Sequence, residues 1–344
     1  MKKEARKRTN LRTKHRKLSG KELSNYVEQL FEERGRDPFE IAKKLVLEEA
    51  DKIESKAIRD ALRYLTGYWT DTTRPALLSI ACEAAGGNPE ATAAVAVPLI
   101  LICGAVDVHD DIIDKSIAKR KHLTLYGKFG AEIATLVGDA LLFKGLAMLG
   151  EAKEGISTGK SEEILRITKE LFFELGDAEA LELSFRGRTD LKAEDYLAMV
   201  TKKAADAEAY LRISAIIADA SEEETDALAG YGRVLGKLII LGDDNSDMLS
   251  PSEMVNRIRN EALPLSLLYA LENPEPRRLL MRILAKKKIT MNDARHILNL
   301  TYEAGAFDRM ATLMRNLIKE GKSRMQAMKN PELLEAILDS AYPE

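Results

Sequence analysis

Hydrophobic and polar positions recur at helical spacing along most of the chain. Residues 22–66 alternate apolar and charged side chains with the period of an outer helix, and Pro38 suits a helix start. Residues 161–187 repeat the amphipathic pattern, and residues 195–220 are expected to form one further helix. The pattern therefore predicts an all-α protein.

Two segments are apolar almost all round. They comprise residues 89–114 and residues 129–149. A helix without a polar face is normally buried, so we expect both segments in the core. The longest apolar run, residues 91–106, is interrupted by Pro98 and is short for a membrane span. We therefore expect a soluble protein.

Composition adds a large core and no strong electric field. The hydrophobic content is 45%, and a net charge of -3 with interspersed signs argues against a nucleic acid partner. Nothing marks a boundary within residues 21–344, so one domain is expected. Residues 1–20 form a basic arm, interpreted as disordered, with contact to an anionic membrane surface as the alternative. Cys82 and Cys103 are expected in the core of a cytoplasmic protein.

Two acidic clusters follow apolar segments. The first lies in residues 107–114 and the second in residues 243–247. Carboxylates are seldom buried without a cation, and oxygen ligands of this kind suit Mg²⁺. Asp110 and Asp114 are one helical turn apart and should share a face. We expect the two clusters to face each other and to clamp a metal-bridged polyphosphate.

These motifs resemble those of the trans-isoprenyl diphosphate synthases, the polyprenyl synthetase family, from about residue 60 to 320. Residues 109–114 are similar to the first Asp-rich motif of that family. Residues 138–142 are similar to its Gly-Asp-x-Leu element, and residues 231–247 to the run into its second motif. The resemblance implies the isoprenoid synthase fold, a single large helical bundle around a central apolar cavity.

The resemblance also implies a reaction. Mg²⁺, expected as three ions bound with diphosphate, would draw the diphosphate from an allylic prenyl diphosphate, and isopentenyl diphosphate would attack the resulting cation. The implied metal ligands are Asp110, Asp111, Asp114, Asp243, Asp244 and Asp247. The implied catalytic residues are Asp110, Asp111, Asp114, Lys203 and Asp243. The implied substrate-binding residues are Arg74, Lys119, Arg120, Lys203 and, on the cavity wall that sets product length, Ala105.

Departures from the family pattern concentrate on the isopentenyl diphosphate side. Asp71 stands where the family has a lysine, Cys103 where it has a histidine, and Asn260 where it has another lysine. An aspartate in place of a lysine exchanges attraction to a diphosphate for repulsion. The chain thus resembles a divergent member with an altered second-substrate site.

Three functions follow from this pattern. The first is a chain-elongating prenyltransferase, and the second is a terpene cyclase or prenyl diphosphate lyase that needs no isopentenyl diphosphate. The third is a non-catalytic subunit that binds prenyl diphosphate. The scarcity of aromatic residues, at 6%, argues against a cyclase, and the retained aspartates argue against a non-catalytic subunit. A homodimer, or a heteromer with a homologue, is expected.

Overall fold

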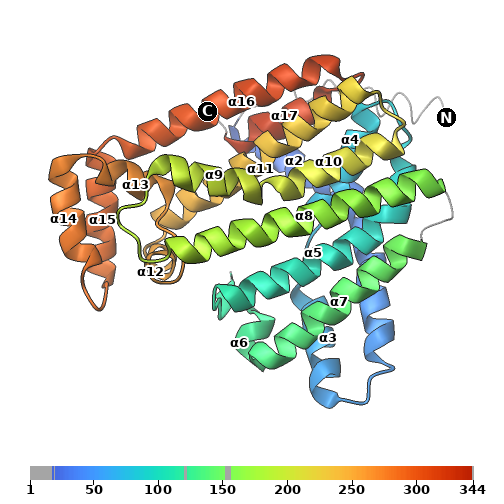
Figure 1. Ribbon diagram of the computed structural model, residues 1–344, viewed down its shortest axis with the longest axis horizontal. Coiled ribbons are helices and arrows are strands. Elements are labelled where there is room, and N and C mark those ends of the chain that lie inside the picture. The colour runs from blue at the N-terminus through green and yellow to red at the C-terminus, as the bar shows by residue number, and fades with distance from the viewer. Residues whose placement is uncertain (1–17, 19, 120–121, 152–155, 343–344) are drawn as a thin grey trace. The chain divides into compact units, whose positions relative to one another are not determined.

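The computed structural model is all-α apart from one short hairpin in the part of the chain that it describes (Figure 1). The described residues are 18, 20–119, 122–151 and 156–342. The prediction of an all-α fold is confirmed. The basic arm lies almost entirely outside the described residues, and Gly20 already begins the first helix.

The helices follow one another with short connections. The first half of the chain forms α2 (Gly20–Ala50), α3 (Lys56–Tyr68), α4 (Thr73–Ala84), the 3-10 turn η2 (Pro89–Thr92), α5 (Ala93–Ile113), β1 (Ala118–Lys119), β2 (His122–Leu123), α6 (Leu125–Phe129), α7 (Ala131–Glu151) and α8 (Thr158–Phe185). The second half forms α9 (Ala193–Lys203), α10 (Ala205–Ile217), α11 (Glu222–Leu249), α12 (Pro251–Asn260), α13 (Leu265–Leu271), α14 (Pro274–Leu284), α15 (Met291–Glu303), α16 (Ala306–Arg324), η3 (Met325–Ala327) and α17 (Glu332–Ala341).

The contacts between residues divide the chain into two compact units. The N-terminal unit comprises Asn25–Thr168 and Tyr210–Thr225, and the C-terminal unit comprises Met1–Ser24, Lys169–Ala209 and Asp226–Glu344. The first acidic cluster belongs to the N-terminal unit and the second to the C-terminal unit. Their facing each other, like the expected single domain, stays a prediction.

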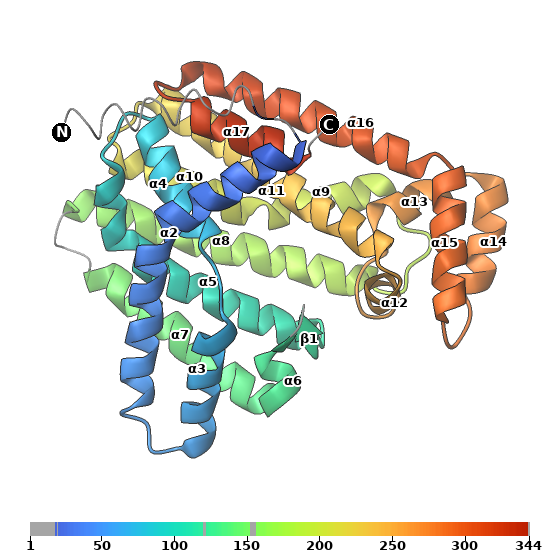
Figure 2. The same ribbon diagram turned by 180° about the vertical axis from the view of Figure 1, so that it is seen from behind.

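The core of the N-terminal unit is built around α5 and α7, which run side by side (Figures 1 and 2). A Cβ atom added to Gly145 of α7 would lie 2.7 Å from the carbonyl oxygen of Pro98 and 2.6 Å from the Ile102 side chain. Glycine therefore permits this close approach of the two helices. Both α7 and the segment Pro89–Ile113 are long and apolar enough to cross a membrane, but the latter is mostly buried within the protein.

A second close approach fixes the loop before α4. A Cβ atom on Gly35 of α2 would lie 2.0 Å from the carbonyl oxygen of Thr72, so only glycine lets the loop pack there. The expected helix start at Pro38 is wrong, because α2 continues through that proline. Proline has no backbone N–H and so is best tolerated in the first turn of a helix, where the N–H groups lack partners. Here the helix continues through Pro38 because apolar side chains that follow it, Phe39 and Val46, are buried.

The C-terminal unit is held by buried polar and glycine contacts. Tyr231 of α11 is buried and donates a hydrogen bond to the carbonyl oxygen of Leu334 in α17. A Cβ atom on Gly236 would lie 2.8 Å from the Ala204 side chain, so α11 packs closely where α9 ends. The expected single helix over residues 195–220 is wrong, because it is divided at Ala204. Helices α14 and α15 pack side by side (Figure 2).

Candidate functional site

The first acidic cluster lies where α5 ends. The Ser116 N–H donates to the carbonyl oxygen of Asp111, and the Lys115 N–H donates to that of Ile112, which closes the helix. Lys115 has φ of 54°, a left-handed conformation that usually costs a non-glycine residue about 1–2 kcal/mol. This turn reverses the chain immediately after the aspartates.

The hairpin after that turn returns a lysine to the cluster. Ala118 pairs with Leu123 and Lys119 with His122, and the Thr124 hydroxyl donates to the carbonyl oxygen of Ser116. The Lys119 Nζ atom lies 2.7 Å from Asp111 and 3.4 Å from Asp110. Lys119 therefore offsets part of the negative charge of the two adjacent aspartates.

Burial has a cost for Asp111 that Lys119 only partly offsets. Asp111 is buried, and burial raises the pKa of its carboxyl group while Lys119 acts in the opposite direction. Asp110 and Asp114 remain partly exposed. The cluster thus offers oxygen ligands of different accessibility, with an ammonium group already beside them.

Arg74, expected to bind diphosphate, contacts two carboxylates. Its Nη1 atom lies 2.9 Å from Asp71, and its Nη2 atom lies 3.1 Å from Asp107. Asp71 is buried and also accepts a hydrogen bond from the Arg74 backbone N–H. Asp71 therefore holds Arg74 through both its side chain and its backbone N–H.

The Gly-Asp element of α7 meets the same end of α5. The Nε2 atom of His109 lies 3.2 Å from the Asp139 carboxylate. A Cβ atom on Gly138 would lie 2.5 Å from that same Nε2 atom. Gly138 therefore leaves the space in which His109, the residue before Asp110, is positioned.

Two candidate residues lie deeper along α5. Ala105 is 0% exposed and belongs to the apolar cluster that also contains Trp69 and Leu101. The Cys103 sulfur atom lies 2.8 Å from the Tyr210 hydroxyl, with both side chains buried. Cys103 therefore takes part in a buried contact with Tyr210.

The second acidic cluster is closed by an arginine. The Nη2 atom of Arg257 lies 2.7 Å from Asp244, and its Nη1 atom lies 2.9 Å from Asp247. The Tyr196 hydroxyl donates to the other oxygen of Asp244 at 2.5 Å. Burial raises the pKa of Asp244, and Arg257 acts against that shift.

Lys203, the other candidate for diphosphate contact, is also paired. It lies at the end of α9 and contacts Glu179, at 2.8 Å, and Glu182. Arg120, by contrast, lies outside the described residues. Each described cation that was expected to meet a diphosphate therefore has at least one carboxylate beside it.

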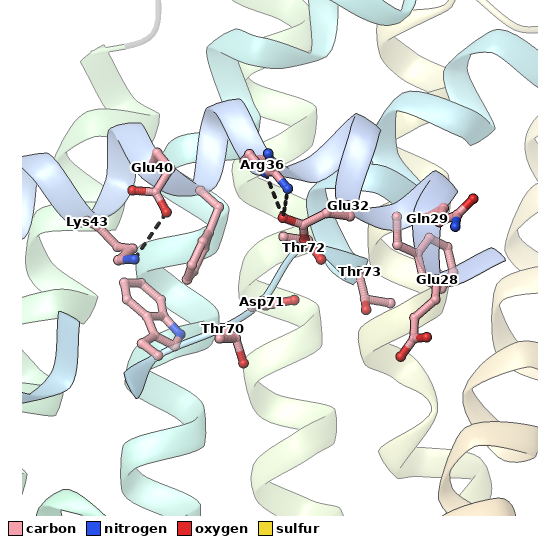
Figure 3. A pocket seen from close by; sticks show the side chains of 13 residues that line it. Glu28, Gln29, Glu32, Arg36, Glu40, Lys43, Thr70, Asp71, Thr72 and Thr73 are labelled. Atoms are coloured by element: carbon pink, nitrogen blue, oxygen red, sulfur yellow. Dashed lines mark hydrogen bonds and ion pairs between the residues drawn. The ribbon is translucent and has the colours of Figure 1, made fainter. Parts of the chain in front are cut away.

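A cavity of about 590 Å³ lies beside the loop that carries Asp71. It is lined by α2 and by residues 69–73, and its rim is polar (Figure 3). Glu32 pairs there with Arg36, and Glu40 pairs with Lys43. Its many charged side chains make it unlike the apolar cavity expected for a prenyl chain.

Comparison with known proteins decides the family. The profile of the polyprenyl synthetase family matches residues 55–301. The chain belongs to the polyprenyl synthetase family. This polyprenyl synthetase is an isoprenyl diphosphate synthase, a prenyltransferase of isoprenoid biosynthesis. It is 28% identical over 277 residues to the geranylgeranyl diphosphate synthase of Methanosarcina mazei, which covers 78% of this chain and 83% of that protein.

Solved structures agree on the fold. The geranylgeranyl pyrophosphate synthetase of Pyrococcus horikoshii gives a TM-score of 0.81 at 23% identity, covering 92% of this chain and 99% of that one. A polyprenyl synthase of Caulobacter crescentus, solved with calcium and isoprenyl diphosphate, gives 0.77 at 23% identity, covering 91% and 96%. The predicted isoprenoid synthase fold is confirmed.

The family uses divalent metal ions with diphosphate, and the two clusters of this polyprenyl synthetase suit them to different degrees. Oxygen-only ligands at the end of α5, two of them partly exposed, fit a hard cation. In the second cluster both oxygens of Asp244 already have partners. Among the described residues, no three carboxylate, histidine or cysteine side chains are already grouped as metal ligands.

Sequence reasoning missed two residues of the second cluster. Tyr196 comes from α9 and Arg257 from α12, and both contact Asp244. Arg257 stands ten residues after Asp247 in a segment rich in charges, where no motif distinguishes it. The high proportion of charged residues in that segment was the only indication in the sequence.

Proposed function

We propose that this synthase releases diphosphate from an allylic prenyl diphosphate at its first acidic cluster and joins the prenyl group to isopentenyl diphosphate. The observation that carries the proposal is the oxygen-rich end of α5, where Lys119 lies beside Asp110 and Asp111. A buried apolar helix that ends in aspartates can bring a charged diphosphate to the edge of an apolar interior. Ala105, deeper along that helix, is proposed to border the prenyl tail.

Asp110, Asp111 and Asp114 would hold Mg²⁺ at the first cluster. Asp243, Asp244 and Asp247 are the proposed ligands of the second, and three ions in all are proposed. Bound Mg²⁺ would neutralise the charge that develops on the departing diphosphate. The apolar residues around α5 would exclude water from the carbocation that remains.

The cations of the chain would complete the diphosphate site. Both contacts of Lys119 are ion pairs between side chains, so its ammonium group can move from the aspartates to a phosphate oxygen without a change in the backbone. Lys203 and Arg74 are proposed to do the same from Glu179 and Asp107. Each cation would exchange its carboxylate partner for a phosphate group, so its positive charge would have an anionic partner both before and after the substrate binds. Arg120 remains a proposed contact.

The test is to incubate the pure protein with Mg²⁺ and each allylic diphosphate, with and without isopentenyl diphosphate. Diphosphate release and the product mass are measured. Elongation is expected, and it should fall by orders of magnitude in Asp110→Ala. Asp51→Ala, which removes an exposed aspartate of the same unit, is the matched control. No release and no product with any substrate would contradict the proposal.

Ionisation without isopentenyl diphosphate is a second candidate, and one observation favours it. Asp71 holds Arg74, and neither Cys103 nor Tyr210 can carry a positive charge, so the expected second-substrate residues offer little net attraction to a diphosphate. In that case diphosphate release would proceed at the same rate with and without isopentenyl diphosphate. The same assay therefore separates the two candidates.

We also propose that the synthase is a homodimer formed through α7. Leu136 and Phe143 of that helix are 55% and 72% exposed. Large apolar side chains gathered on one helix mark an interaction surface. A reducing cytoplasm is the proposed location, because Cys82 and Cys103 are buried and are not joined by a disulfide.

A further inference from the structure

The second acidic cluster contains a buried carboxylate that lies between an arginine and a tyrosine. Asp244 is 2% exposed. Arg257 contacts its Oδ1 atom at 2.7 Å, and the Tyr196 hydroxyl donates to its Oδ2 atom at 2.5 Å. A buried carboxylate needs a positive partner, and Arg257 supplies it.

Arg257 also contacts two further acids. It contacts Asp247 at 2.9 Å and Glu261 at 3.1 Å, and its own side chain is only 11% exposed. It lies on α12, which follows α11 after a single residue, so the chain itself holds the guanidinium close to the aspartates. A planar guanidinium with several N–H groups suits such bridging.

A divalent cation would need the same atoms. Mg²⁺ binds carboxylate oxygens at about 2.1 Å, and it would lie close to guanidinium nitrogens that already contact Asp244 and Asp247. The bound metal ion and the guanidinium would be neighbouring cations, and neighbouring cations repel each other. The metal and the guanidinium therefore exclude each other at these oxygens.

We propose that Arg257 is the resident cation of the second cluster and takes the place of a divalent ion there while no substrate is bound. This inference refines the metal assignment within the proposed function. It predicts that the second cluster holds no metal ion in the substrate-free protein. The second cluster accepts a metal only when Arg257 leaves its carboxylates.

The test is a titration of the full-length protein with Mn²⁺ alone, with free Mn²⁺ followed by electron paramagnetic resonance. Arg257→Met should add one Mn²⁺ per chain, with at least tenfold tighter binding than any corresponding site in the wild type. Arg259→Met is the matched control, since Arg259 lies on the same helix and contacts the carbonyl oxygen of Ile289 instead. It should bind Mn²⁺ like the wild type.

Asp247→Asn locates the added site. It should leave the Mn²⁺ stoichiometry of the wild type unchanged and abolish the gain in the Arg257→Met background. A lower stoichiometry for Asp247→Asn alone would overturn the inference, as would no gain in folded Arg257→Met. If Arg257→Met does not fold, the comparison of the wild type with Asp247→Asn decides by itself. Because no substrate is present, prenyl transfer is tested separately from this result.

Discussion

At the scale of single residues, three cations each contact carboxylates of their own unit. Lys119 lies on the first cluster, Arg257 on the second, and Lys203 between two glutamates. Half-buried ion pairs of this kind contribute little net stability, because desolvation offsets much of the attraction. Their effect is to give each buried or half-buried carboxylate a positive partner.

Asp71 provides the first prediction at this scale. Asp71→Asn removes a carboxylate 2.9 Å from Arg74, while Asp107 stays in place. A negative charge near a diphosphate opposes binding by about 1–4 kcal/mol, so we expect the KM for isopentenyl diphosphate to fall about tenfold. Steady-state kinetics would show this, with Asp51→Asn as a control of equal charge change. Equal KM values in Asp71→Asn and the wild type would place the second substrate away from Arg74.

Ala105 provides the second prediction. It is fully buried, one and a half turns before Asp110 on α5. Ala105→Phe should shorten the longest product, because the ring would fill space proposed for the prenyl tail. The same change can strain the core by about 1–3 kcal/mol, so thermal unfolding is measured alongside product mass. A folded variant with an unchanged product range would exclude this wall of the cavity.

At the scale of elements, the approach of α5 to α7 brings His109 to Asp139. Glycines on α7 allow it, as Gly138 lies against His109 and Gly145 against the backbone of Pro98. Helix α5 carries the aspartates of the first cluster, and the hairpin carries Lys119. The packing of these two elements therefore sets the geometry of the first cluster.

Gly145→Ala tests this contact. The added Cβ atom would lie 2.7 Å from a backbone oxygen, which cannot move aside as a flexible side chain can. We expect a loss of about 1–3 kcal/mol in the free energy of unfolding. Gly150→Ala on the same helix meets nothing within 4 Å and should gain about 0.5–1 kcal/mol. Chemical denaturation measures the free energy of unfolding of both variants. If Gly145→Ala were as stable as the wild type, the close approach of α5 and α7 would not be needed for stability.

The elements also show how far sequence reasoning reaches. The helix ending at the first cluster was predictable because an apolar run must be buried, and aspartates are rarely buried unless they are paired or hold a metal. The hairpin that carries Lys119 was not, since its strands are only two residues long and carry no period-two pattern. Arg257 was missed because an ion pair between helices leaves no periodic signal. The continuation of α2 through Pro38 reflects tertiary packing, which overrides local propensity.

At the scale of the whole molecule, α7 raises the question of what covers its outer face. It is apolar enough to pass for a membrane helix, yet only a third of that segment is buried within the chain. A helix with apolar side chains on every face should be covered, either by lipid or by protein. The proposed cover is a second copy of the chain. The inner face of α7 already packs on α5, a buried core helix that ends in charged residues, so the outer face of α7 is the one left to cover.

Phe143→Glu with Leu136→Glu tests that proposal. Two charges on the apolar face would be buried without partners in a dimer but solvated in a monomer, so they should shift the mass from two chains to one. Light scattering after size-exclusion chromatography measures this. Ile117→Glu with Ile41→Glu replaces two apolar residues of similar exposure outside α7 and should leave the dimer intact. A dimer that survives the α7 changes, or a wild type that is already monomeric, would contradict the proposal. Loss of the dimer only in the α7 variant would make that face the interface.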